Sequence, residues 1–208
     1  MQMPRVLSTV LLTALALGAW TEHAFTQSDP QIGLLVESAG KVSVNRSGNT
    51  VSPGVGDDLF EGDTVSTGES GKARILLKDN SVLLMGPETI MDLNAVDLGR
   101  DRNLSLRARV GSFLVQVADW LGGGSSNSIF ATPTATAAVR GTTVWGNTEL
   151  DAICALAGTV SVTPRAGADN TVTISAGQCV QNMATGTAEP LQPSREQLEA
   201  FLDQVTIP

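Results

Sequence analysis

The chain has 208 residues, a formal net charge of −8 at pH 7 and 42% hydrophobic residues. This length suits one domain, or one domain with a short extension. An acidic chain without a broad basic face is excluded as a nucleic-acid binder, because neutralisation of phosphates drives that binding. The single histidine and two cysteines further restrict the chemistry that the chain can perform.

The first 24 residues are predicted to be a signal peptide rather than part of the fold. Arg5 gives a short positive start, and residues 6–19 form an apolar run without a charge. This run is too short to span a bilayer, and the small residues Ala19 and Ala24 offer cleavage sites after it. The alternative is an uncleaved membrane anchor. Cleavage would leave a chain that is periplasmic or secreted and not integral to a membrane.

From Gly40 onward, apolar residues recur with a period of two, which is typical of β-strands. The recurring positions are Val42 and Val44; Ala73, Ile75 and Leu77; Val82 and Leu84; Leu104, Leu106, Ala108 and Val110; and Phe113, Val115 and Val117. Asp79-Asn80 is predicted to form a two-residue hairpin turn, because both residues tolerate the left-handed conformation. Residues 122–128 are predicted to form a flexible loop. Many short strands with glycine turns predict an all-β domain over residues 30–185.

A weak internal repeat limits the number of β architectures that the chain could form. Gly40-Lys-Val-Ser-Val is echoed by Gly158-Thr-Val-Ser-Val, and each is followed by Asn-Thr-Val, at residues 49–51 and 170–172. Self-similar strand units of this kind suit a solenoid, a roll or a sandwich of paired hairpins. The predicted fold is therefore a short-stranded, solenoid-like or sandwich β domain.

Cys154 and Cys179 are predicted to form a disulfide. Val160 and Val162, with Val172 and Ile174, resemble the two arms of a hairpin whose turn lies at residues 165–170. The two cysteines lie at nearly equal distances on either side of that turn, so pairing places them opposite one another in a closed hairpin over residues 150–182. The alternative is a reactive or metal-binding pair, which lacks a C-x-x-C spacing and a nearby histidine.

Residues 186–208 are predicted to form a linker, stiffened by Pro190 and Pro193, and an amphipathic helix. Ser194 and Gln197 have the spacing of a capping box. The apolar face of the helix consists of Leu198, Phe201, Leu202 and Val205. One interpretation is that this helix closes an open end of the β domain, and the other is that it docks a partner.

The sequence contains few residues that could act in catalysis. The only histidine, His23, lies in the predicted leader, and the sequence contains no nucleophile elbow, phosphate loop or dinucleotide fingerprint. No cofactor is expected. A carboxylate cluster comprises Asp57, Asp58, Glu61 and Asp63. Turn formation is the favoured interpretation, with Ca²⁺ binding and acid–base catalysis as alternatives. The Asp58 carboxylate is expected to contribute to stability.

A local basic patch consists of Arg100, Arg102, Arg107 and Arg109. Arg107 and Arg109 alternate with apolar residues, so a solvated strand face is favoured. Binding of an anionic envelope polymer or lipid headgroup is the alternative.

Four segments, in this order, resemble the FecR-type domain of bacterial envelope proteins. They begin at Gly56-Asp-Asp-Leu-Phe-Glu-Gly-Asp, Ala73-Arg-Ile-Leu-Leu-Lys-Asp-Asn, Gly111-Ser-Phe-Leu-Val-Gln-Val and Thr132-Pro-Thr-Ala, and the last is followed by the most telling motif, Val139, Arg140, Gly141 and Thr142. The resemblance covers residues 40–145. Gly141 is expected to allow a bulge or close approach within a strand over residues 137–145, and Arg140 to bond carbonyls or a carboxylate, with ligand binding as the alternative.

The resemblance implies a β-rich domain outside the cytoplasmic membrane. Well-known members relay transporter occupancy to a sigma factor through a cytoplasmic segment, whereas this chain has a leader in that place. It looks more like the stand-alone exported members. The leading hypothesis is a non-catalytic module that binds an envelope protein or polymer. The alternatives are a carboxylate-based polysaccharide hydrolase or lyase, which needs two facing carboxylates, and an indirect component of envelope and iron-transport signalling.

Overall fold

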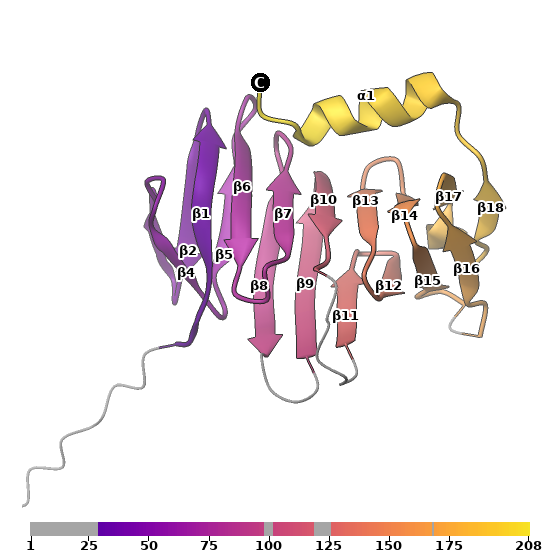
Figure 1. The fold of residues 1–208 in the computed structure, drawn as a ribbon, viewed down its shortest axis with the longest axis horizontal. Coiled ribbons are helices and arrows are strands. Elements are labelled where there is room, and N and C mark those ends of the chain that lie inside the picture. The colour runs from indigo at the N-terminus through magenta and orange to yellow at the C-terminus, as the bar shows by residue number, and fades with distance from the viewer. Residues whose placement is uncertain (1–28, 98–101, 119–125, 168) are drawn as a thin grey trace, which may run out of the picture.

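The computed structural model describes residues 29–97, 102–118, 126–167 and 169–208. The predicted signal peptide lies outside these residues, as do Arg100 and most of the loop predicted at residues 122–128. Two nine-stranded sheets stack on one another, and a C-terminal helix lies beside them (Figure 1). Within the described part of the chain, no helix is long and apolar enough to cross a membrane.

The first sheet, called sheet A, contains the strands that carry the C-terminal helix. In spatial order its strands are β18 (Glu189–Leu191), β17 (Gln178–Gln181), β14 (Ala152–Ala157), β13 (Thr143–Asn147), β10 (Ser112–Gln116), β7 (Val82–Met85), β6 (Lys72–Leu77), β1 (Gln31–Ala39) and β4 (Asp58–Phe60). All of its strand pairs are antiparallel.

The second sheet, called sheet B, packs against the inner face of sheet A. In spatial order its strands are β16 (Val172–Ser175), β15 (Thr159–Pro164), β12 (Ala135–Val139), β11 (Ser126–Ala131), β9 (Arg102–Val110), β8 (Ile90–Asp97), β5 (Thr64–Thr67), β2 (Val42–Arg46) and β3 (Asn49–Val51). β9 and β11 pair in parallel. The residues from 126 to 128 belong to β11, so the loop predicted at residues 122–128 ends earlier than expected.

The architecture combines the two predicted alternatives. The chain crosses between the sheets after every one or two strands, and both sheets advance along the molecule in nearly the order of the sequence. The result is a sandwich that is wound like a solenoid. One continuous core fills the space between the sheets, from Ile32 near β4 to Ala188 near β18.

The alternation of apolar residues places most of the predicted positions in this core. Val42, Val44, Ile75, Leu104 and Val115 are among the residues that are fully or almost fully buried there. Strand β7 differs, because its core face consists of Leu83 and Met85, while Val82 and Leu84 share the opposite face. A short run of four apolar residues has no polar partner in alternation, so the sequence leaves its inward face undetermined.

The hairpin between β6 and β7 has a three-residue loop rather than the predicted two-residue turn. The Leu77 N–H donates to the carbonyl of Ser81, and the Asn80 N–H donates to the carbonyl of Leu77. Only Asn80 has a positive φ, of 65°. The Asp79 carboxylate is buried and accepts the N–H and the hydroxyl of Ser81, which favours the longer loop.

The internal repeat corresponds to two equivalent corners of the fold. Gly40 turns the chain from β1 of sheet A into β2 of sheet B, and Gly158 does the same between β14 and β15, with φ of 63° and 69°. Each following strand forms a hairpin, with β3 or with β16. These hairpins lie at opposite ends of sheet B, so the repeated sequence marks the two edges of the sheet.

The C-terminal segment contains more sheet than expected. Residues 189–191 form β18, which pairs with β17, although residues 186–208 were predicted to be linker and helix. A 3₁₀ helix (Met183–Thr185) precedes β18, and α1 (Arg195–Val205) follows it. The predicted capping box of Ser194 and Gln197 is present in both directions.

Candidate functional site

In the acidic segment, the carboxylates of Asp57 and Asp63 bond the backbone of the turns in which they lie. Asp57 accepts the N–H of Gly54 at 2.7 Å, and Asp58 is exposed and accepts the side-chain amide of Gln31. Asp63 is fully buried and accepts the N–H of Phe60 at 2.8 Å. Within the described ranges, no three His, Cys, Asp or Glu residues are grouped so that they could hold a metal ion.

Of the salt bridges among the described residues, the one between Arg46 and Asp63 has the most deeply buried carboxylate. The Nε and one terminal nitrogen of Arg46 each donate to Asp63 at 2.8 Å, and the guanidinium lies 4.2 Å from the centre of the Phe60 ring. The hydrogen bond with Asp63 raises the pKa of Arg46. Because the folded-state pKa of Arg46 is raised above its ordinary value, its guanidinium stays charged across the physiological pH range. Asp63 is buried and paired whereas Asp58 is exposed, so Asp63, rather than the expected Asp58, is the carboxylate of this segment placed to contribute to stability.

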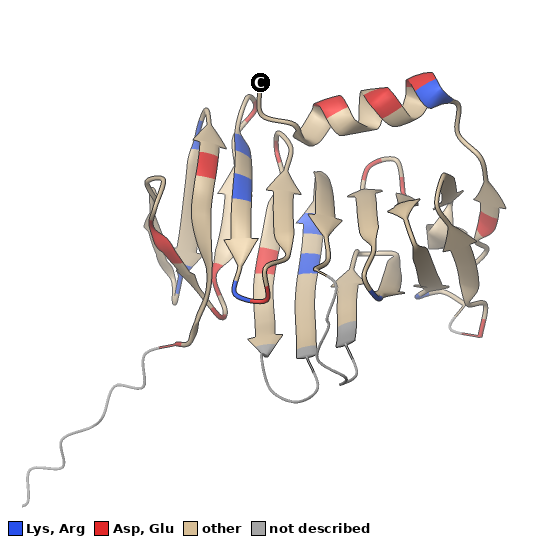
Figure 2. Ribbon diagram, viewed as in Figure 1, with Lys and Arg blue, Asp and Glu red and all other residues tan. Residues whose placement is uncertain are grey.

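The described part of the basic patch is a strand face. Arg107 and Arg109 are exposed on β9, and Arg109 forms a salt bridge with Asp92 of β8 at 2.8 Å. The bond with Asp92 raises the pKa of Arg109. Figure 2 shows the basic and acidic positions of β9 and β8 side by side. Arg100 and the side chain of Arg102 are not among the described parts of the chain. The predicted patch of four arginines is therefore described only at Arg107 and Arg109.

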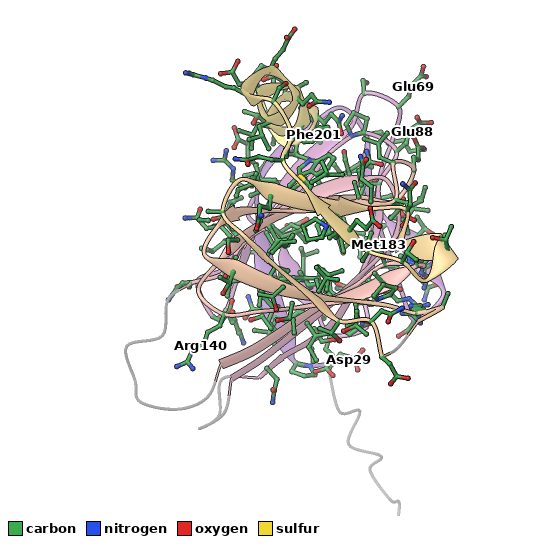
Figure 3. The ribbon with its side chains drawn as sticks, turned by 90° about the vertical axis from the view of Figure 1, so that its right-hand side faces the viewer. Asp29, Glu69, Glu88, Arg140, Met183 and Phe201 are labelled. Atoms are coloured by element: carbon green, nitrogen blue, oxygen red, sulfur yellow. A yellow bond between two sulfur atoms is a disulfide. The ribbon has the colours of Figure 1, made fainter. Side chains whose placement is uncertain are left out.

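The Val-Arg-Gly-Thr motif forms a corner and not a bulge within one strand. Val139 ends β12 and is buried in the core, and Gly141, with a φ of 53°, turns the chain towards β13. The Thr142 hydroxyl donates to the carbonyl of Arg140 at 2.7 Å and lies 3.2 Å from that of Thr159. Arg140 is exposed and points away from the sheets (Figure 3). No hydrogen bond or ion pair joins Arg140 to another of the described residues, so its expected role in bonding carbonyls or a carboxylate stays a prediction, as does ligand binding.

The two cysteines are bonded to one another, at directly opposed positions of β14 and β17. Their Cα atoms are 4.0 Å apart, and 25 residues separate them in the sequence. The predicted hairpin is longer than its arms in sheet B, because both arms continue across a corner into sheet A. The disulfide lies on the outer face of sheet A, in a small apolar cluster separate from the main core.

Helix α1 covers this outer face and not an open end of the sandwich. Phe201 stacks on Trp145 of β13, with ring centroids 4.1 Å apart and planes within 10°. Figure 3 shows Phe201 on the side of α1 that faces the sheets. Val205 is fully buried and Leu198 is half-buried, but Leu202 is 37% exposed. Of the predicted apolar face, Leu202 therefore lies at the margin.

Among the described residues, hydrogen bonds between α1 and the sheets are made only at the C-terminal end of the helix. The Lys72 ammonium donates to the carbonyls of Asp203 and Thr206 at 2.8 and 2.6 Å. A cation at this position also interacts favourably with the helix dipole. The Asn147 amide donates to the side chain of Gln204 at 3.3 Å. The capping bonds and the Arg195–Glu199 ion pair at the other end are internal to the helix.

One row of paired residues crosses the outer face of sheet A, and α1 covers part of this row. Directly paired residues on adjacent strands share one face, and the pairing connects one residue from each of eight strands. This outer row consists of Glu37, Arg74, Leu84, Leu114, Trp145, Cys154, Cys179 and Leu191. α1 runs in the same direction, across the strands from the β18 end towards β6 (Figure 1).

The outer row contains two donors whose hydrogen bonds are not made. Within the described residues, the only buried side-chain nitrogen or oxygen atoms without a partner are Nε of Arg74 and Nε1 of Trp145. Trp145 is completely buried, and Arg74 uses another nitrogen in a 3.3 Å ion pair with Glu37. Buried donors are nearly always paired, so among the buried side chains that the structure describes these two donors stand out.

Sequence reasoning did not identify the outer row. Its members are spread from residue 37 to residue 191, and no local motif connects them. The available signal was the apolar outer face of single strands, such as Leu114 between Phe113 and Val115. Such runs indicate burial on both faces of a strand, but they do not show which strands become neighbours.

Comparison with known proteins places the fold. A family model described as FecR protein matches residues 63–168, just over half of the chain. No curated protein shows significant similarity to the chain.

Among solved structures, two crystal structures of a candidate anti-sigma factor from Parabacteroides distasonis ATCC 8503, at 2.50 and 1.65 Å resolution, share the fold. Both superpose with a TM-score of 0.52, at 18% and 17% identity, over 67% of this chain. The chain spans 63% and 64% of those proteins, which is less than two thirds of their length. Identity this low establishes similarity of fold alone. The match of the family model shows that the chain belongs to the FecR protein family.

Proposed function

We propose that the chain is an exported, non-catalytic module that binds a protein partner in the cell envelope and takes part in signalling. Membership of the FecR family over residues 63–168 carries this proposal. The fold shared with a candidate anti-sigma factor supports a regulatory rather than an enzymatic role, as an analogy between folds.

The use of the carboxylates supports the non-catalytic part of the proposal. Asp57, Asp63, Asp79 and Asp151 each accept a backbone N–H, at 2.7 to 2.9 Å. A hydrolase needs one carboxylate that is free to act as an acid and another that faces it. Carboxylates engaged in this way are instead typical of turns.

The disulfide supports export. Disulfides persist in oxidising compartments such as the periplasm and the extracellular space, and Cys154 and Cys179 are joined at opposed positions of the sheet. We therefore infer a periplasmic or secreted location, with residues 1–24 removed as a signal peptide. Mass spectrometry of the protein from an envelope fraction should find a chain that begins at or near residue 25.

The proposed function is tested by capture of partners from crosslinked envelope fractions. The tagged chain is expected to enrich one membrane transporter or membrane regulator reproducibly, relative to an unrelated exported protein with the same tag. Enrichment of glycan or peptidoglycan fragments alone would contradict a protein partner and indicate an envelope scaffold. Repeated absence of any enriched protein would also contradict the proposal.

A further inference from the structure

We propose that α1 occupies, within its own chain, a docking site for an amphipathic helix of a partner protein, and that the partner binds by replacing α1. This inference rests on the proposed protein-binding function and assigns its site. The site is the outer row from Arg74 to Leu191, together with Lys72 beside it.

The first argument is that α1 is attached weakly for a covering element. Of its eleven residues, only Val205 is fully buried, while Leu198, Phe201 and Gln204 are partly buried. An isolated helix of this length is marginal in water, so these few contacts decide whether it stays in place. Residues 192–194 connect it to β18, and the helix can leave without breaking any strand pairing.

The second argument is that the covered surface is a suitable docking surface in its own right. Leu84, Leu114, Trp145 and Leu191 form one apolar stripe together with the disulfide, and strand pairing holds them in a fixed arrangement. Polar residues, including Lys72, Arg74 and Asn147, lie at its margin. Contiguous apolar stripes with a polar rim mark interaction sites in soluble proteins, and grooves of this kind bind amphipathic helices.

The third argument is that two donors of the outer row have no acceptor while α1 is in place. The indole N–H of Trp145 and the Nε–H of Arg74 remain without acceptors while α1 is bound. An occupant that supplied an acceptor to each donor would gain hydrogen bonds that α1 does not make, and bonds to the charged Arg74 would be the stronger ones. The site therefore favours a partner helix with carboxylate or amide side chains along its margin.

The contacts of α1 also define the features of the partner helix. It should present an aromatic residue to Trp145, as Phe201 does, and an aliphatic residue one turn later, as Val205 does. Its C-terminal carbonyls should end at Lys72, because the ammonium is already placed to bind a helix C-terminus. An acidic outer face would match α1 itself, which carries three acidic residues and one arginine (Figure 2).

The test uses the chain from residue 25 with its disulfide formed, and a fluorescent synthetic peptide with the sequence of residues 194–208. A tethered helix competes at an effective concentration of about 1 mM, so the wild-type chain should bind the peptide poorly. The variant Phe201→Ala weakens the tethered helix and should bind the peptide at least about tenfold more tightly, as 1.4 kcal/mol of lost competition implies.

Leu202→Ala is the matched control, because Leu202 lies on the same turn but is partly exposed. This variant should bind the peptide like the wild type. A peptide that itself carries Phe201→Ala should bind none of the chains. Equal binding of the wild-type peptide to all three chains would overturn the proposal.

Two further measurements cover the case in which Phe201→Ala fails to fold. In hydrogen exchange of the wild-type chain, the amides of α1 should open at a lower free energy than those of β13 and β14. Opening of α1 only through global unfolding would contradict displacement. The double variant Asn147→Cys/Gln204→Cys, designed from the 3.3 Å contact between these side chains, should lock α1 in place and abolish peptide binding.

The locked variant also separates this inference from the proposed function. If envelope capture finds a partner that the locked chain binds equally well, the protein-binding function stands and the α1 site is wrong. If α1 exchanges with the peptide as expected but no envelope partner is captured, the site behaves as a helix-binding groove and the proposed signalling function fails.

Discussion

At the scale of single residues, two buried features stabilise the corners and turns of the sandwich. Asp63 satisfies a backbone N–H and a guanidinium at once. The Thr142 hydroxyl bridges carbonyls on two sides of a corner. Both residues lie within the stretch that matches the FecR family model, and both act through geometry rather than reactivity.

Asp63→Asn should destabilise the protein by about 2 kcal/mol, because a charge-assisted pair is lost and a buried group is left poorly bonded. The exposed side of Arg46 limits the effect through solvent screening. Urea unfolding measures the change, with Asp58→Asn as the matched control at an exposed position, where a change within about 0.5 kcal/mol is expected. Equal effects at both positions, or a melting temperature that rises with added CaCl₂, would refute the assignment of this segment to turn chemistry.

Gly158→Ala should be more destabilising than Gly177→Ala. Both glycines have positive φ, of 69° and 85°, so alanine at either position costs about 1 kcal/mol of backbone strain. A Cβ at Gly158 would also lie 2.9 Å from the Thr142 hydroxyl, whereas a Cβ at Gly177 would meet nothing within 4 Å. The difference in unfolding free energy should exceed about 1 kcal/mol. Similar values for the two variants would show that the corner relaxes freely.

At the scale of elements, the long hairpin from β14 to β17 is closed by its disulfide on the outer face of sheet A. The bond closes a loop with a sequence separation of 25 residues. It therefore limits the unfolded chain at the end of the sandwich where β18 and α1 attach.

The double variant Cys154→Ala/Cys179→Ala should lose about 3 kcal/mol of stability through the restored entropy of the unfolded chain. Urea unfolding under oxidising conditions gives the difference from the wild type. Added reductant should lower the stability of the wild type by a similar amount and leave the double variant unchanged. A wild type whose stability is insensitive to complete reduction of the bond would disprove this contribution.

At the scale of the whole molecule, the winding resembles a solenoid, but the core does not consist of separate repeats. One apolar cluster extends along the full length of the sandwich. Its outermost strands are short, with three residues in each of β3, β4 and β18 and four in β16, which leaves little exposed edge for pairing with other chains.

A continuous core predicts cooperative unfolding of the two sheets. In hydrogen exchange at increasing urea concentration, amides of β6 near one end and β14 near the other should converge on the same opening free energy. A solenoid of independent repeats would instead lose its ends first. Stepwise loss of one end would show that the cluster does not act as a unit.

The sequence by itself determined the β class, the inward faces of most strands, the cysteine pairing and the capped helix. Each of these depends on residues that are near in the chain: alternation within a strand, symmetry about a hairpin turn, or a box of four residues. Gly158 and its echo at Gly40 even marked two corners of the fold. Membership of the FecR family was visible in the same way, in an ordered set of short motifs.

Only the tertiary structure decided which residues form a surface. The outer row takes one residue from each of eight strands, from Glu37 to Leu191, and strand order and register bring them together. The role of Asp63 was also fixed by a neighbour distant in sequence, since its carboxylate pairs with Arg46. The local sequence shows which residues of a strand share a face. Which strands lie beside it, and which element covers it, depend on long-range packing.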